Sequence, residues 1–141
     1  MRVVLDTNVL LSGLMTPDAP PGMLLRAWVE RRFALVTSEA QLTELQRVLN
    51  YPKLRRRIQK HVAGALINRL RERAEIVKPA RVPIHLPDED DLLILGTAVA
   101  GKAEVLVTGD KSHLLALEKY GKTRIVTPAR AVKVLGVIRG R

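Results

Sequence analysis

The chain has 141 residues, which is enough for one domain with a hydrophobic core and too few for two ordinary domains. Its 24 Lys and Arg residues against 14 Asp and Glu give a formal net charge of +10 at pH 7, which favours a polyanionic partner such as nucleic acid. The sequence contains no cysteine, which excludes disulfides, thiolate metal sites and thiol catalysis, and its 3 histidines lack the spacing of a zinc site.

Apolar runs of strand length alternate with segments of helical period along the chain. This pattern is typical of an α/β fold in which helices flank a central parallel sheet. In the first half we predict strands at residues 2–5, 33–36 and 76–77. Helices are predicted after Pro21-Gly22, from Ser38 as N-cap to Leu49, and over residues 54–74, with Gly64 as a candidate point of division.

The second half begins with a loop that contains prolines at positions 79, 83 and 87. A helix over 88–100 is apolar on nearly all sides, which predicts burial. Strands at 105–107 and 124–126 enclose a helix over 112–120 that Gly121 closes, and Thr127-Pro128 begins a last helix. We predict one domain over residues 1–135 and a flexible basic tail over 136–141. Neither a signal peptide nor a membrane span is predicted, so we expect a cytoplasmic protein.

Acidic residues directly follow two of the predicted strands. Asp6 ends the apolar run that starts at Val3, and Asp110 ends the run that starts at Val105. Because ligands bind beyond the carboxyl ends of parallel strands, we expect both acids to face one crevice at that edge of the sheet. Acids are also common in ordinary turns, and a turn role for either residue is the alternative.

Two further acids, each in a predicted helix, are candidates for the same edge of the sheet. Glu44 lies roughly 40° outside the apolar arc of its predicted helix, so its side chain can point along the buried face toward the strand ends. Among the acids at 88–91 we choose Asp91 as the functional one, because it leads directly into the buried helix. Asp88 is the expected N-cap, and Asp90 could support Asp91. The alternatives are an exposed Glu44 and a purely helix-stabilising role for the acids at 88–91.

Carboxylates that converge on one crevice repel one another unless a cation lies among them. Mg²⁺ and similar hard cations prefer oxygen ligands, so a carboxylate cluster in an otherwise basic protein indicates a divalent metal. We therefore predict a Mg²⁺- or Mn²⁺-dependent enzyme that acts on an anionic substrate.

The same residues resemble the motifs of a known family. These motifs are Leu5-Asp6-Thr7-Asn8, Thr43-Glu44-Leu45, Asp91 seven residues before Ala98, and Val107-Thr108-Gly109-Asp110. In this order and spacing they are similar to those of PIN domains, in particular the small bacterial and archaeal PIN proteins of the VapC type, the toxins of toxin–antitoxin pairs. The resemblance extends from Val3 to about Pro128.

The resemblance implies a ribonuclease in which acids hold Mg²⁺ or Mn²⁺. The acids that match by position, as metal-binding and catalytic residues, are Asp6, Glu44, Asp91 and Asp110. Asn8 and Thr108 would support them. An antitoxin partner and a homodimer are further expectations. Many relatives carry one more acid shortly after the last one, where this chain has Lys111-Ser112-His113, so the number of bound metals, one or two, stays open.

A basic segment provides the expected contacts to RNA phosphates. Residues 53–73 contain eight cations and a single acid, Glu72. The residues predicted to bind RNA are Lys53, Arg55, Arg56, Arg57 and Lys60. The alternative is a solvated helical face, or an Arg-rich surface of the kind found in some heat-stable proteins.

Two other function classes remain open. Phosphatases and phospho-receiver domains also place an Asp at the end of a first strand, but such phosphatases need a second Asp two residues later, where this chain has Asn8. A non-catalytic nucleic-acid- or protein-binding module on the same scaffold would bind without turnover. Aromatic residues make up only 3% of the chain, which argues against binders that stack bases on aromatic platforms.

Overall fold

The computed structural model describes residues 1–109 and 111–137. Its centre is a six-stranded sheet with the order β3-β2-β1-β4-β6-β5. The strands are β1 (Arg2–Leu5), β2 (Ala34–Thr37), β3 (Glu75–Ile76), β4 (Val105–Val107), β5 (Lys119–Tyr120) and β6 (Thr123–Val126). All neighbouring strands run parallel except β5, which pairs antiparallel with β6. The predicted α/β architecture with a central parallel sheet is confirmed.

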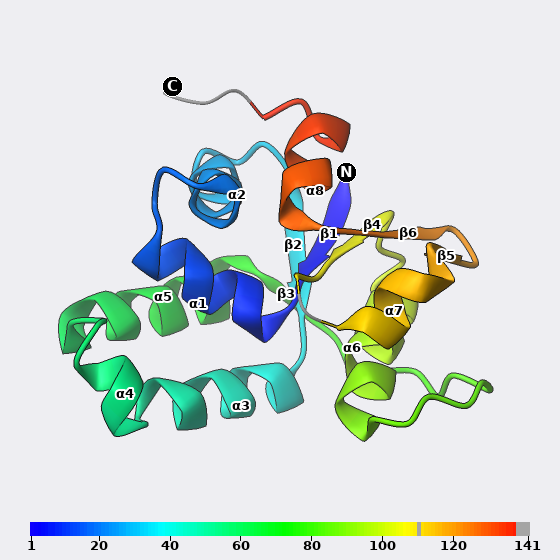
Figure 1. The fold of residues 1–141 in the computed structure, drawn as a ribbon, viewed down its shortest axis with the longest axis horizontal. Helices are drawn as coiled ribbons and strands as arrows, with labels where there is room; N and C mark the ends of the chain where they lie inside the picture. The colour runs from blue at the N-terminus through cyan, green and yellow to red at the C-terminus, as the bar shows by residue number, and fades with distance from the viewer. Residues whose placement is uncertain (110, 138–141) are drawn as a thin grey trace.

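Helices cover both faces of this sheet. They are α1 (Thr7–Met15), α2 (Pro20–Val29), α3 (Glu39–Leu49), α4 (Pro52–Arg55), α5 (Lys60–Arg73), α6 (Glu89–Ala100), α7 (Ser112–Leu117) and α8 (Pro128–Val134). Figure 1 shows α1, α3, α4 and α5 on one side of the strands and α6 and α7 on the other. The chain therefore forms three layers, with the sheet between two layers of helices.

The alternation of side chains along the strands divides the core into two halves. Val3 and Leu5 of β1 belong to one hydrophobic cluster, whereas Val4 between them belongs to the other. In the same way, Leu106 of β4 points away from its neighbours Val105 and Val107. This period of two is the geometry of a strand that is buried on both faces, and it explains why these strands are continuously apolar in sequence.

Two elements were not predicted. Helix α1 follows β1 at once, and the Asp6 side chain caps it by accepting a hydrogen bond from the backbone N–H of Thr7 at 2.7 Å. The segment expected as one helix over 112–120 ends at Leu117, because Glu118 takes a left-handed conformation with φ 60° and the chain turns into β5. Gly121, with φ 58°, lies in the turn between β5 and β6 and does not close α7.

The predicted division at Gly64 is wrong. Helix α5 continues through this residue, and the break between α4 and α5 falls at residues 56–59. Ile58 is buried there, and Leu66 and Leu70 of α5 are buried as predicted. Ile58 in the break, Leu66 of α5 and Leu54 of α4 thus belong to one apolar cluster, which holds α4 and its basic residues against the rest of the fold.

Two glycine substitutions should have opposite effects on stability. A Cβ at Gly64 would meet no atom within 4 Å, so Gly64→Ala should stabilise the protein by about 0.5–1 kcal/mol through helix propensity. A Cβ at Gly96 would lie 2.3 Å from the backbone oxygen of Ala80, so Gly96→Ala should destabilise it. Urea unfolding of both variants measures the two changes, and equal destabilisation would contradict this account of α5.

The C-terminal end is packed as far as it is described. The carbonyl of Gly136 accepts a hydrogen bond from Arg32 at 3.0 Å, and Val137 packs against the apolar cluster beneath α8. The remainder of the predicted tail, residues 138–141, lies outside the described residues. Among the described helices, none is long and apolar enough to cross a membrane.

Candidate active site

Asp6 is fixed at the carboxyl ends of two adjacent strands. It follows β1 directly and is only 4% exposed. Its Oδ2 accepts a hydrogen bond from the hydroxyl of Thr108 at 2.9 Å, and its backbone N–H donates to the carbonyl of Val107 at 2.9 Å. Both partners belong to the end of β4, which pairs with β1 in parallel. Asp6 therefore serves as a helix cap and as a buried carboxylate at the edge of the sheet.

Glu44 reaches this edge from α3. It is half-buried, and its Oε1 accepts a hydrogen bond from the Thr7 hydroxyl at 2.5 Å. Helix α3 is itself tied to the sheet, because the Gln41 amide donates to the carbonyl of Leu5 at 2.6 Å and its oxygen accepts from Thr37 at 2.6 Å. The predicted direction of Glu44 along the buried face is confirmed by these contacts.

Asp91 is a buried carboxylate in the first turn of α6. Only 2% of it is exposed, and its Oδ1 has no hydrogen-bond partner. The ammonium group of Lys111 lies 3.8 Å from this oxygen, which is an ion-pair distance and too long for a hydrogen bond. Burial raises the pKa of Asp91 above its ordinary value, while the charge of Lys111 acts in the opposite direction.

Of the neighbouring acids, Asp88 has the role that the sequence predicted, and the supporting role of Asp90 stays a prediction. The Asp88 side chain caps α6 by accepting from the backbone N–H of Asp90 at 2.9 Å. Asp90 is exposed at the surface of the same turn. Asp91 is thus the acid of this group that the fold buries, as the sequence predicted.

A cavity of about 190 Å³ lies among these groups. Its lining includes Asp6, Glu44, Asp90 and Lys111, which come from the junction of β1 and α1, from α3, from α6 and from the segment before α7. Asp110, the fourth predicted acid, lies outside the described residues, between Gly109 and Lys111. Within residues 1–109 and 111–137, no group of three or more Asp, Glu or His side chains lies close enough to hold a metal ion together.

The chemistry of the oxygen donors near Asp91 is nevertheless of the kind that a divalent cation prefers. A buried carboxylate oxygen without a donor is rare in folded proteins and calls for an ion, a water or a functional role. The donors near the cavity are carboxylates and threonine hydroxyls, which are oxygen ligands of the type that Mg²⁺ and Mn²⁺ prefer. Lys111 supplies one positive charge to Asp91 in this structure.

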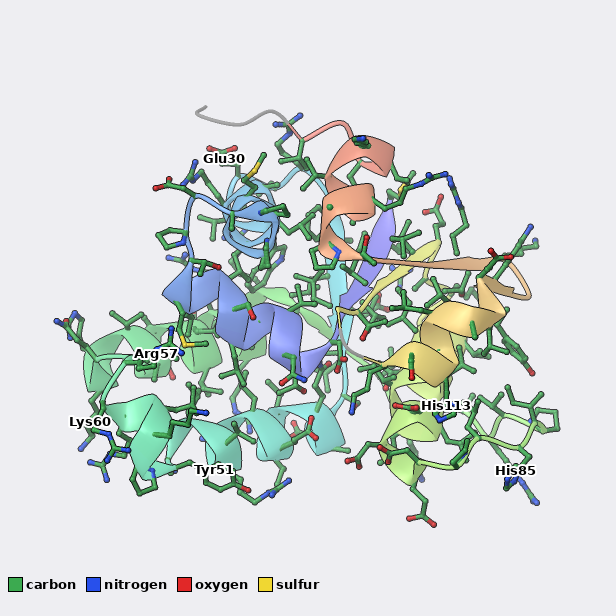
Figure 2. The ribbon with its side chains drawn as sticks, viewed as in Figure 1. Glu30, Tyr51, Arg57, Lys60, His85 and His113 are labelled. Carbon is green, nitrogen blue, oxygen red and sulfur yellow. The ribbon has the colours of Figure 1, made fainter. Side chains whose placement is uncertain are left out.

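The predicted RNA-binding residues lie on the flank formed by α4 and the start of α5. Lys53 and Arg57 line a second cavity, which also contains Asn8, the predicted supporting residue next to Asp6-Thr7. Arg55, Arg56 and Lys60 are exposed. Figure 2 shows Arg57 and Lys60 on this flank, opposite the side on which His85 and His113 lie.

Three residues of the site were not predicted. Thr7 holds Glu44, Gln41 ties α3 to β1, and Lys111 neutralises Asp91. Two of them stand beside a predicted acid in the sequence, Thr7 after Asp6 and Lys111 after Asp110. Their position next to a predicted acid is the sequence signal that could have identified Thr7 and Lys111. No such signal exists for Gln41, because its contact with Leu5 depends on how α3 crosses the sheet.

Comparisons with known proteins agree with this fold. The family model of the PIN domain matches residues 2–112. An uncharacterized protein of Methanocaldococcus jannaschii is 30% identical over 123 residues, which are 86% of this chain and 78% of that protein. PIN domains have a nuclease-type fold and are generally metal-dependent nucleases. The chain belongs to the PIN domain family.

Proposed function

We propose that this chain is a Mg²⁺- or Mn²⁺-dependent endoribonuclease and the toxin component of a toxin–antitoxin pair. The observation that supports catalysis best is the buried Oδ1 of Asp91, which has no hydrogen-bond partner and lies beside the crevice that Asp6 and Glu44 line. A protein that used this fold only as a scaffold would have no need to bury a carboxylate at a cost in stability.

The residues that would hold the cation are Asp6, Glu44 and Asp91, with Asp110 as the fourth. When bound, the cation would lower the pKa of a water molecule and neutralise charge on the phosphate oxygens. The protein's own contribution is positional: Thr108 orients the Asp6 carboxylate and Thr7 orients Glu44. Such supporting hydrogen bonds commonly affect metal affinity or activity by about 10–100-fold.

RNA is the proposed substrate because the net charge of +10 favours a polyanion. The basic residues of α4 and its flanks, Lys53, Arg55, Arg56, Arg57 and Lys60, would bind phosphates without reading the sequence. Two of these residues, Lys53 and Arg57, line a cavity that also contains Asn8 and Gly109, which lie close in sequence to Asp6 and Asp110.

A cleavage assay tests the proposal directly. Purified protein should cut unstructured RNA in Mn²⁺ or Mg²⁺ and not in EDTA. Glu44→Gln should lower the rate by about 10–100-fold or more, because the amide keeps the shape of the side chain and loses its charge. Glu39→Gln is the matched control: Glu39 lies on the same helix in an exposed ion pair with Arg71 at 3.0 Å, and its loss should leave the rate unchanged.

Binding of RNA without cleavage in any of these metals would contradict the nuclease proposal. It would favour the second candidate, a PIN-like module that binds nucleic acid without turnover. Equal rates for wild type and Glu44→Gln would remove Glu44 from the site while leaving the nuclease itself in place.

A groove between α1, α2 and α5 supports the proposal of an antitoxin partner. It has a volume of about 410 Å³. Its lining combines apolar side chains, among them Leu25, Trp28 and Leu66, with the cations Arg26 and Arg69. An amphipathic helix with acidic flanks would complement these walls. The homodimer remains a proposal from the family resemblance, and light scattering of the purified chain would measure it.

A further inference from the structure

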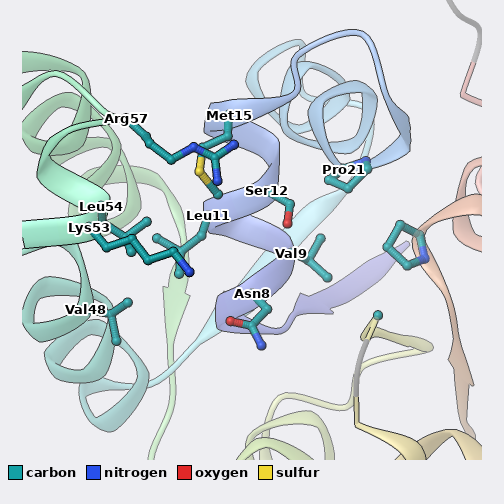
Figure 3. Close-up of a pocket in the computed structure, with 12 residues that line it drawn as sticks. Asn8, Val9, Leu11, Ser12, Met15, Pro21, Val48, Lys53, Leu54 and Arg57 are labelled. Carbon is teal, nitrogen blue, oxygen red and sulfur yellow. The ribbon is translucent and has the colours of Figure 1, made fainter. Parts of the chain in front are cut away.

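A second cavity beside the proposed active site lies between α1 and α4. It has a volume of about 580 Å³, and Figure 3 shows the side chains that line it. At one end it is lined by Asn8, which follows Asp6-Thr7, and by Gly109, which follows Thr108. The cavity therefore begins at the backbone segments that carry the acids and extends away from them toward α4.

One wall of the cavity is a single face of α1. Asn8, Leu11, Ser12 and Met15 have the spacing i, i+3, i+4 and i+7, and Figure 3 shows Ser12 and Met15 on this face. The opposite wall includes Val48 and Leu54, and Pro21 and Pro128 complete the lining. Most of the lining is thus apolar, with a few polar groups near the acid end.

The other distinctive feature is a pair of cations. Lys53 and Arg57 are exposed side chains at the α4 side, and Figure 3 shows both of them reaching toward α1. Among the described residues that line the cavity, these two are cationic and none is acidic. An apolar pocket with two cations at one side fits a ligand that combines a flat, weakly polar body with negative charge.

We propose that this cavity binds one unpaired nucleotide of the RNA substrate, next to the phosphate at the acids. The base lies against the apolar wall of α1, and the phosphates on the side away from the acids contact Lys53 and Arg57. The volume is within the usual range of about 300–1,000 Å³ for small-ligand pockets, and a paired base in a duplex could not enter it. This inference rests on the proposed nuclease function and adds the requirement for an unpaired nucleotide.

The first test uses wild-type protein and equilibrium binding in EDTA, where no cleavage occurs. The probes are a short unstructured RNA and a series in which a single abasic nucleotide is moved one position at a time. Loss of the bound base should weaken binding about tenfold at one or two neighbouring positions and little elsewhere. Equal affinity for every member of the series would overturn the proposal.

The second test changes the cavity itself. Ser12→Phe fills the wall at a half-buried position and should weaken binding of the intact RNA about tenfold while abolishing the effect of the abasic position. Gln46→Phe, an exposed position of α3 outside the cavity lining, is the matched control and should behave as wild type. Thermal melting of both variants shows that they fold.

The cations are tested by salt dependence. Lys53→Gln combined with Arg57→Gln should reduce the slope of log affinity against log salt by about 1.4, which is 0.7 for each lost contact to a single strand. Lys119→Gln combined with Lys122→Gln removes the same charge from exposed positions of the β5–β6 hairpin and should change the slope little. Identical slopes for the two double variants would overturn the assignment of these cations.

The two proposals can fail separately. If wild type binds RNA with one sensitive abasic position but cleaves nothing in Mg²⁺ or Mn²⁺, the nuclease proposal fails and the cavity remains a nucleotide site. If wild type cleaves RNA but the abasic series is flat and Ser12→Phe matches Gln46→Phe, the cavity proposal fails and the nuclease stands.

Discussion

Asp6→Asn is expected to lower the rate of RNA cleavage by more than about a hundredfold, beyond the range usual for residues that only support a metal site. Asparagine keeps the size of the side chain and is as good a helix N-cap as aspartate, so it can still accept from the Thr7 N–H. At the position of Oδ2 the variant carries an amide nitrogen, which can donate to the Thr108 hydroxyl, so this contact is kept with its direction reversed. What the variant loses is the negative charge.

The structural role of Asp6 is separated from the chemical one by measuring stability beside activity. Asp6→Asn should unfold at a urea concentration close to that of wild type. Asp18→Asn is the matched control, since Asp18 is an exposed acid whose side chain lies 3.8 Å from Arg26, and its loss should leave cleavage intact. A fully active and stable Asp6→Asn would remove Asp6 from the catalytic site, and an unfolded one would mean that the cap is its dominant role.

The sheet was predictable because each of its long strands has a strong local signal. The runs Val3-Val4-Leu5 of β1 and Val105-Leu106-Val107 of β4 are apolar and rich in β-branched residues, and a polar residue follows each. The Ser38 cap is equally local, and its hydroxyl accepts from the N–H of Gln41 at 3.2 Å as predicted. Such signals depend only on residues that are close in sequence, so they can be recognised without knowledge of the tertiary structure.

Helix α1 was missed because its sequence carries little amphipathic contrast. Residues 7–15 contain no charged side chain, and apolar residues occupy most of the helix surface. Its start signal, Asp6, is read from the sequence as a functional acid, with a role in an ordinary turn as the alternative. The two interpretations are compatible, since Asp6 caps α1 through Oδ1 and accepts from Thr108 through Oδ2.

The geometry of the site depended on contacts across the fold. Thr7 meets Glu44 across 37 positions of sequence, and Thr108 meets Asp6 across 102. Periodicity placed Glu44 near the correct edge, but only the register of β1 with β4 and the Gln41 contact to Leu5 bring α3 to it. The ion pair of Lys111 with Asp91 likewise depends on how the start of α7 faces α6.

Asp91→Asn is expected to melt at a higher temperature than wild type when both are measured in EDTA at neutral pH, by on the order of a few degrees. Burial is the largest influence on Asp91 and disfavours its charged form, and the attraction of Lys111 at 3.8 Å is the smaller, opposing influence. A carboxyl with a raised native pKa binds its proton more tightly in the native than in the unfolded state. The free energy of unfolding of the wild type therefore falls as the pH rises from the ordinary pKa of aspartate to the raised pKa of Asp91 in the native state. At neutral pH the full cost of burying the charged carboxylate is present.

Because the asparagine does not titrate, the advantage of Asp91→Asn should shrink as the pH is lowered toward the ordinary aspartate range. Added Mg²⁺ should reverse the order of the two proteins. At a concentration about 100 times its dissociation constant, a ligand of the native state stabilises it by about 2.7 kcal/mol, and the variant, which lacks one carboxylate, should gain much less. Melting curves with and without EDTA and Mg²⁺, at neutral and acidic pH, measure all of these shifts. A variant that melts below wild type in EDTA and responds to Mg²⁺ as strongly would make Asp91 a structural residue of α6 and leave the metal to the other acids.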